Sequence, residues 1–172
     1  ARRLMQLVDN VLAFRRREWP ARTTAVTALE PQPLAPLVRE TLATFAPMAA
    51  TTQSRIRLVR ADDVVAPVDR DAVRQIFLNL LPNATKYGPA GQTIRVAVAA
   101  DDGRARLTVE DEGPGIPAAH RERVWQPFVR LERDVDAQIA GSGIGLAVVR
   151  NLVARLGGVA RIEDAPNGGA RV

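Results

Sequence analysis

A predicted hairpin near the middle of the chain places the strongest constraint on the fold. Residues 93–99 and 104–110 are two strand-like runs, in which apolar side chains alternate with polar ones over 93–96 and 104–110, and Asp101-Asp102-Gly103 lies between them. Alternation with a period of two predicts strands with one buried face, and Asp-Gly is a strong hairpin turn signal. The apolar face of such a hairpin has to be covered, and the chain supplies helices before and after it.

Further helices and strands surround the hairpin. Apolar residues at helical spacing predict helices over residues 37–50, 69–86, 118–124 and 144–156. Asp69 is suited to cap the second of these, and Gly157-Gly158 ends the last. Short strands are predicted over 55–60, 64–68, 159–163 and 170–172, and 126–143 is expected to be irregular. This mixture predicts an α+β fold, a two-layer sandwich with helices on one side of a sheet.

The first 19 residues predict a separate helix. Its seam has the spacing of a coiled coil, with Leu4, Leu7, Val11 and Phe14. We interpret it as one half of an antiparallel helix pair, although an ordinary core-facing helix has the same pattern. An apolar stripe without its partner predicts self-association. The Pro-rich stretch that follows divides the chain into a helix (1–19), a linker (20–33) and a main domain (34–172).

Composition excludes several kinds of chemistry. The chain has no cysteine and one histidine, which excludes disulfide scaffolds, thiolate zinc sites and a histidine metal cage. The net charge is +5, but the arginines are scattered and aromatic residues make up only 4%, so no nucleic-acid surface is predicted. No apolar run reaches the ~18–20 residues that a membrane span needs.

The predicted helix over 69–86 has a polar face of unusual composition. Asn79 and Asn83 are four residues apart and Lys86 follows a turn later, so the three share a face. Lys86 is the only lysine in the chain, and two of its five asparagines are here. Two amides and an ammonium group on one stripe indicate a surface for phosphate and metal, although a solvent-facing stripe is also polar.

Two glycine-rich segments follow this helix. Residues 111–117, Asp-Glu-Gly-Pro-Gly-Ile-Pro, come directly after a predicted strand and place a carboxylate beside backbone that a ligand can approach closely. Residues 141–146, Gly-Ser-Gly-Ile-Gly-Leu, open an apolar helix, where free N–H groups and the helix dipole favour phosphate. This segment does not follow a strand and lacks Gly-Lys-Ser/Thr, which excludes a Rossmann fingerprint and a Walker P-loop.

These segments, in order, resemble the N, G1, F and G2 boxes of sensor histidine kinases. The asparagine helix resembles the N box, residues 111–115 resemble G1, Trp125-Gln126-Pro127-Phe128 resembles F, and 141–145 resembles G2. Asn167-Gly168-Gly169-Ala170 resembles the last glycine turn of the family. The resemblance implies a Bergerat ATP-binding fold for the main domain, with a mixed sheet covered on one face by helices. It also implies that the first helix belongs to the hairpin for dimerisation and histidine phosphotransfer.

The resemblance implies a role for each side chain at the nucleotide. Asp111 would accept a hydrogen bond from the adenine amino group, and Tyr87 would pack on the base. Asn83 would bind Mg²⁺ through its amide oxygen, and Asn79 and Lys86 would face the phosphates. The remaining ATP-binding positions that it implies are Gly113, Gly115, Ile116, Gly141, Ser142, Gly143, Ile144, Gly145 and Leu146.

Residues 126–143 would form a mobile lid over the nucleotide, anchored by Phe128. Arg130 matches a basic position that steadies the γ-phosphate, with Arg133 as the nearby substitute. Together with Asn83 and Lys86, Arg130 is therefore a predicted catalytic residue.

Three positions depart from the family pattern or need separate interpretation. Pro82 removes one backbone hydrogen bond of the asparagine helix at a cost of about 3 kcal/mol, and a kink there would turn Asn79 away from Asn83. Trp125 stands where the family usually has phenylalanine. His120 is followed by a basic residue rather than an acidic one, so we interpret it as a surface residue and not as the phosphoacceptor.

The implied function is that of the ATP-binding catalytic domain of a sensor histidine kinase, with ATP and Mg²⁺ as cofactors. Its partners would be the helical hairpin of the parent protein and the receiver domain of a response regulator, in the cytoplasm, and membrane anchoring of the parent stays open. An ATPase of the same fold, such as gyrase B, is the main rival, but those enzymes carry a glutamate one turn before the metal-binding asparagine, where this chain has Asn79. The lid glycines and Lys86 argue against a nucleotide-binding module without kinase activity, and an anti-sigma serine kinase would not need the seam of the first helix.

Overall fold

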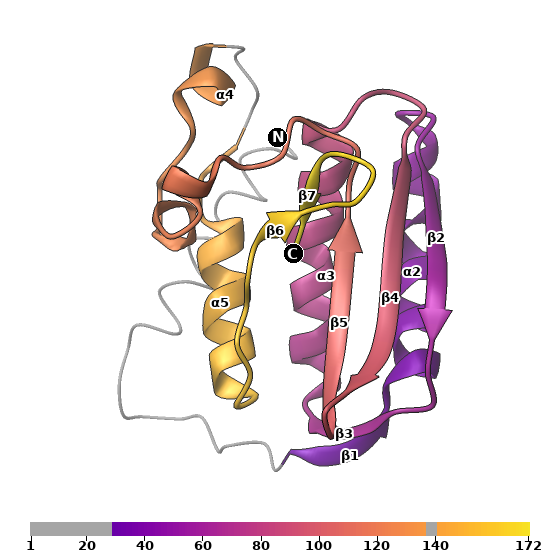
Figure 1. Ribbon diagram of the computed structural model, residues 1–172. Coiled ribbons are helices and arrows are strands. Elements are labelled where there is room, and N and C mark those ends of the chain that lie inside the picture. Colours follow the sequence, from indigo (N-terminus) through magenta and orange to yellow (C-terminus); the bar gives the residue numbers. More distant parts are fainter. Residues whose placement is uncertain (1–28, 137–140) are drawn as a thin grey trace, which may run out of the picture.

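A five-stranded mixed sheet forms one layer of the structure. The computed structural model describes residues 29–136 and 141–172, so the predicted N-terminal helix and residues 20–28 of the predicted linker lie outside the described residues. The strands lie in the order β2-β4-β5-β7-β6 (Figure 1). β2 is parallel to β4 and the other pairs are antiparallel, which confirms the hairpin and the mixed sheet. The strands are β2 Arg55–Ala61, β4 Thr93–Asp101, β5 Arg104–Glu110, β6 Glu163–Asp164 and β7 Ala170–Arg171.

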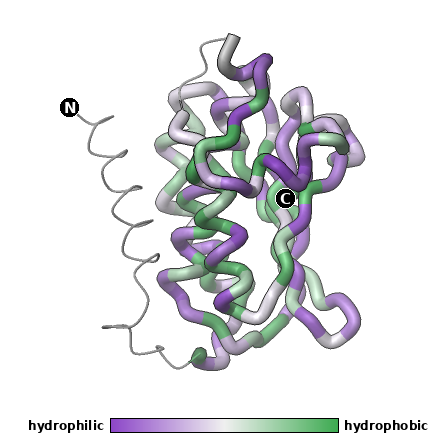
Figure 2. The backbone as a smooth tube through the Cα atoms, turned by 90° about the vertical axis from the view of Figure 1, so that its left-hand side faces the viewer, coloured by the Kyte–Doolittle hydropathy of each residue, from purple (hydrophilic) through white to green (hydrophobic). Residues whose placement is uncertain are grey.

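Three helices form the second layer of the sandwich. They are α2 (Leu34–Ala50), α3 (Arg70–Tyr87) and α5 (Gly145–Arg155), and they lie along one face of the sheet (Figure 1). Figure 2 shows apolar and polar stretches alternating along the helix that faces the viewer, as expected when one face of a helix is buried. The core between the layers contains Phe77, Leu81, Ile94, Val96, Val98 and Leu152. The predicted α+β two-layer sandwich is therefore confirmed, and no helix of the described ranges is long and apolar enough to cross a membrane.

The end of the predicted linker is not irregular but forms one strand of a second, two-stranded sheet. Residues 30–33, where the prolines predicted a connector, form strand β1 (Glu30–Pro33), which is antiparallel to β3 (Val65–Val68). Pro31 lies opposite Pro67, so the pairing includes two residues that have no N–H to donate. An edge strand tolerates proline because one of its sides needs no hydrogen-bond donor. Proline content alone therefore does not distinguish an edge strand from a connector.

Three further segments differ from the sequence prediction. The helix predicted over 118–124 is two short 3₁₀ turns, η1 (Ala118–His120) and η2 (Arg123–Trp125). The stretch predicted to be irregular contains a short helix, α4 (Glu132–Asp136). In place of the strand predicted over 159–163 there is only the two-residue strand β6, in which Glu163 and Asp164 are paired with β7.

Helix α3 begins at its predicted cap and continues through its proline. Asp69 Oδ1 accepts hydrogen bonds from the backbone N–H groups of Asp71 at 2.8 Å and Ala72 at 3.2 Å, which confirms the N-cap. Pro82 lies inside the helix, which continues to Tyr87. The proline therefore does not divide the polar face that the sequence places on this helix.

Candidate functional site

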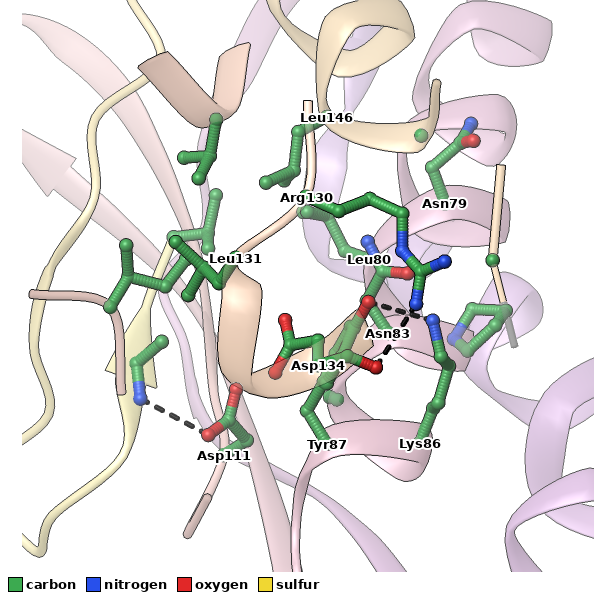
Figure 3. A pocket seen from close by; sticks show the side chains of 18 of the residues that line it. Asn79, Leu80, Asn83, Lys86, Tyr87, Asp111, Arg130, Leu131, Asp134 and Leu146 are labelled. Carbon is green, nitrogen blue, oxygen red and sulfur yellow. Dashed lines mark hydrogen bonds between the residues drawn. The ribbon is translucent and has the colours of Figure 1, made fainter. Parts of the chain in front are cut away.

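One cavity of about 570 Å³ gathers most of the residues that the sequence singles out (Figure 3). It lies between α3, the segment after β5, α4 and the start of α5. Three predicted site residues do not line it: Gly113, Phe128, which is 65% exposed, and Ile144, which is buried in the core. Those that do line it are Asn79, Asn83, Lys86, Tyr87, Asp111, Gly115, Ile116, Arg130, Gly141, Ser142, Gly143, Gly145 and Leu146.

The two asparagines of α3 meet the start of α5. The amide Nδ2 of Asn79 donates to the backbone oxygen of Gln75 at 2.7 Å, which ties this side chain to its own helix. A Cβ built on Gly145 would lie 3.4 Å from Oδ1 of Asn79 and 3.5 Å from Nδ2 of Asn83. The first glycine of α5 therefore brings its helix N-terminus against both amides, where backbone N–H groups favour an anion.

Lys86 is held at the other end of this polar face by its neighbour Tyr87. Its Nζ donates to the Tyr87 hydroxyl at 2.7 Å and lies 4.1 Å from the centre of the tyrosine ring (Figure 3). A Cβ on Gly141 would come within 2.6 Å of the same Nζ, so the glycine lets the chain pass close to the ammonium group. Burial, and then the charge of Arg130, lower the pKa of Lys86 from its ordinary value.

Asp111 lies on the opposite side of the cavity and is fixed by backbone groups. Its Oδ1 accepts from the N–H of Gly113 at 2.9 Å and of Ala170 at 3.1 Å, and its own N–H donates to the Ala170 oxygen at 3.0 Å. Gly169 has φ +89°, and a Cβ there would lie 2.1 Å from the backbone oxygen of Asp111. Burial raises the pKa of Asp111 above its usual range. The last glycine turn thus positions this carboxylate.

The segment expected to be a lid is joined to the start of α5 by backbone contacts. The Phe128 N–H donates to the Gly143 oxygen at 2.9 Å. Both residues have positive φ, +66° and +69°, and a Cβ on Gly143 would lie 2.8 Å from the Phe128 carbonyl carbon. Phe128 is therefore fixed through its backbone while its ring is exposed, and the buried aromatic residue is Trp125, directly before this segment, at 5% exposure.

Two arginines and an aspartate of the same segment line the cavity, and the charges of Arg130 and Asp134 act on Lys86. An Nη2 of Arg130 donates to the backbone oxygen of Asp134 at 3.1 Å, and Arg133 donates to the backbone oxygen of Gly115. Asp134 is only 7% exposed although it is charged. Figure 3 shows Arg130 beside Lys86, and Asp134 between Lys86 and Asp111. The cations of this end thus contact groups of the protein itself.

The donor set fits a metal ion that arrives with a phosphate ligand. Within residues 29–136 and 141–172, no three His, Cys, Asp or Glu side chains are grouped so that they could hold a metal. Mg²⁺ usually retains several waters and takes one or two protein oxygens together with phosphate oxygens. The amide oxygens of Asn79 and Asn83 beside the α5 N-terminus match that need.

Sequence reasoning missed two charged residues that shape the cavity. Asp134 had no motif to mark it, because its burial depends on where α4 lies relative to the site. Arg121 donates from Nε to the Ile116 oxygen at 3.0 Å and pairs with Asp164, and so holds the glycine segment after β5 in place. The pair between Arg121 and Asp164 joins parts of the chain that lie far apart in sequence, and local spacing cannot show it.

Residues 68–172 match the family described as "Histidine kinase-, DNA gyrase B-, and HSP90-like ATPase". The chain belongs to this family. The match includes α3, both glycine-rich segments and β7, which are the elements that build the cavity. Membership in the histidine kinase-, gyrase B- and HSP90-like ATPases therefore confirms the resemblance that the ordered segments indicated.

Relatives of known name in this family are sensor kinases. Sensor protein RstB of Escherichia coli strain K12 is 37% identical over 106 residues, which are 62% of this chain and 24% of that protein. The adaptive-response sensory kinase SasA of Synechococcus sp. (strain JA-2-3B'a(2-13)) is 47% identical over 87 residues, 50% of this chain and 22% of that protein. The chain thus spans about a quarter of the length of the curated relatives that it matches.

Solved structures of histidine kinases share the fold. The mycobacterial sensor histidine kinase MprB has a TM-score of 0.70 at 28% identity, with 83% of this chain and 92% of that chain covered. Full-length ShkA in complex with AMPPNP has a TM-score of 0.76 at 29% identity, with 98% of this chain and 34% of that chain covered. The sandwich is therefore that of a histidine kinase ATP-binding domain.

Proposed function

We propose that this chain binds Mg-ATP and acts as the catalytic domain of a sensor histidine kinase, donating the γ-phosphoryl group to a histidine of a helical hairpin. The main observation that supports the proposal is that the two ends of the cavity carry groups of opposite charge. A fixed carboxylate, Asp111, lies at one end, and Lys86 lies at the other beside the glycine segment before α5. These ends suit the base and the phosphates of one nucleotide.

Each group of the cavity then has a part in holding the nucleotide. The adenine amino group donates to Asp111, and apolar side chains from β5, α5 and the glycine segment after β5 enclose the base. The phosphates lie between Lys86 and the N-terminus of α5, and Asn83 holds Mg²⁺ with Asn79 beside it. Arg130 stabilises the charge of the transferring group, since phosphoryl transfer depends mainly on positioning and electrostatics.

The carboxylates that line the cavity support a kinase rather than an ATPase. Water activation needs a base near the γ-phosphate, and the position one turn before Asn83 is the amide Asn79. Among the described residues that line the cavity, the only carboxylates are Asp111 and Asp134. Asp111 lies at the base end, and Asp134 lies among cations. Neither occupies the position one turn before Asn83, from which the ATPases of this fold activate water.

The partners and setting of the domain belong to the same proposal. The phosphoacceptor would be a histidine on the hairpin of the parent protein, residues 1–19 would be one helix of that hairpin, and a response regulator would receive the phosphoryl group in the cytoplasm. Self-association through Leu4, Leu7, Val11 and Phe14 stays a prediction. Sedimentation should show a concentration-dependent equilibrium that Leu7→Glu abolishes.

Radiolabelled ATP tests the proposed activity. With the hairpin of the parent protein added as a separate polypeptide, label should move from ATP to a histidine of the hairpin. The chain alone should acquire no stable label, and His120→Ala should change neither result, since His120 lies in the 3₁₀ turn η1 and is not among the residues that line the cavity. Label on this chain that His120→Ala removes would contradict the proposal, and rapid release of free phosphate without hairpin would favour an ATPase.

A further inference from the structure

The buried side chain of Gln92 joins the two elements that carry the polar groups of the cavity. Gln92 is 2% exposed, its Nε2 donates to the Ala84 backbone oxygen at 2.7 Å, and its Oε1 accepts from the Glu112 N–H at 3.0 Å. Ala84 lies in the last turn of α3, which also carries Lys86, and Glu112 follows Asp111 directly. One amide group therefore bridges the end of α3 to the residue beside Asp111.

The backbone of Gln92 is fixed as well. Its carbonyl oxygen accepts from the N–H of Arg55 at 2.9 Å, where β2 begins, and its N–H donates to the Pro89 oxygen at 3.3 Å. A side chain anchored in this way cannot follow α3 or the glycine segment if either of them shifts. It holds both against the edge of the sheet.

Gly88 leaves the space that this side chain fills. A Cβ on Gly88 would lie 2.0 Å from Nε2, 2.2 Å from Oε1 and 2.3 Å from Cδ of Gln92. Gly88 has φ −85° and ψ 164°, an extended conformation that any residue adopts, so its backbone gives no reason for glycine. The contact with Gln92 does give one.

We propose that Gln92 is a positioning residue for nucleotide binding and that Gly88 is its steric counterpart. The proposal rests on the proposed function, because one nucleotide has to meet Asp111 and Lys86 at once. Gln92 does not line the cavity, so it acts by fixing the separation of the two ends. Displacements of about 1 Å between groups that share a ligand have large effects on its binding and reaction.

Calorimetric titration of Gln92→Ala with AMPPNP and with AMP tests the positioning role. We expect AMPPNP affinity to fall about tenfold and AMP affinity by less than about twofold. The reason is that binding of AMP does not depend on the correct separation of the two ends of the cavity. Thr41→Ala is the control: Thr41 is 3% exposed and its hydroxyl donates to the Leu37 oxygen within α2, so its loss should lower the melting temperature but neither affinity. Unchanged AMPPNP affinity, or an equal fall for both ligands, would overturn the positioning role.

A double-mutant cycle tests the pairing of the two residues. Gly88→Ala alone should lower AMPPNP affinity about as much as Gln92→Ala, whereas Gly88→Ala combined with Gln92→Ala should be no worse than Gln92→Ala alone. Additive losses in the double variant would contradict the steric pairing. Failure of the wild-type chain to bind AMPPNP at all would overturn the proposed function itself, and this outcome is distinct from a variant that binds like the wild type.

Discussion

The two ends of the cavity are stabilised in different ways. At the base end, Asp111 is held by backbone hydrogen bonds to Gly113 and Ala170, and Gly169 lies against its carbonyl oxygen. At the phosphate end, Lys86 contacts the Tyr87 hydroxyl and Arg130 contacts the Asp134 backbone. The first end is set by the sheet, and the second by long side chains that bond to neighbouring groups of the protein.

This difference indicates how the site would bind a nucleotide. A carboxylate fixed by backbone needs no rearrangement to accept a hydrogen bond, so the base end is organised before the ligand arrives. The cations at the other end have to exchange their contacts within the protein for phosphate oxygens. Affinity should therefore depend most on the base end, and discrimination among mono-, di- and triphosphates should depend on the phosphate end.

The largest expected effect comes from breaking the base end. Asp111→Ala removes a charge-assisted hydrogen bond of roughly 1.5–3 kcal/mol, so affinity for every adenine nucleotide should fall at least about tenfold. Asp101→Ala, at the far end of the β4–β5 hairpin, is the control and should bind normally. Calorimetric titration measures both, and an unchanged affinity in Asp111→Ala would place the base elsewhere.

Removal of the cation at the phosphate end should have a smaller and more selective effect. Lys86→Ala should weaken AMPPNP about tenfold and AMP hardly at all, because only the longer phosphate chain reaches the ammonium group. Lys86→Arg should restore little, since a planar guanidinium cannot take the place of the compact ammonium group that packs beside Gly141. Equal losses for AMP and AMPPNP would contradict the assignment of the two ends.

Substitution of Gly143, where the segment expected to be a lid meets α5, should have a moderate effect. Gly143→Ala forces a side chain into a φ of +69° and against the Phe128 backbone, at a cost of about 1–2 kcal/mol or more, so AMPPNP affinity should fall several-fold. Gly157→Ala is a matched control, because its φ is +73° but a Cβ there meets nothing within 4 Å. Both variants should lose stability in denaturant titrations, and only Gly143→Ala should lose affinity. An equal loss of affinity in the two would show that strain alone is responsible.

The smallest effect should appear in the stability of the ligand-free protein. Burial raises the pKa of Asp111 in the folded state, so between the unfolded and folded pKa values the folded chain binds more protons. Its contribution to the free energy of unfolding therefore decreases as pH rises through that window. Asp111→Asn should raise the free energy of unfolding at pH 7 and make little difference at pH 3. Urea titrations at the two pH values check this, and a destabilised variant at pH 7 would contradict it.

The sequence predicted those parts of the site in which chemistry depends on local spacing. Asn79, Asn83 and Lys86 share a face because of helix geometry, and Asp111 was marked by its place between a strand and two glycines. The fold class followed from alternation and turn signals for the same reason.

Contacts between distant segments account for what the sequence did not predict. Burial of Asp134 depends on where α4 lies, and the pairing of Gly88 with Gln92 depends on the loop after α3. β1 was hidden because prolines that suit an edge strand also suit a linker. The predicted strand over 159–163 is not formed, because pairing with β7 is limited to Glu163 and Asp164.

A crystal structure of the complex with Mg²⁺ and AMPPNP tests the central claim most directly. We expect one nucleotide in the cavity, its adenine amino group donating to Asp111 and its phosphates between Lys86 and the N-terminus of α5, with the metal ion at Asn83. A nucleotide bound in the reverse direction, or outside the cavity, would contradict the assignment of the two ends.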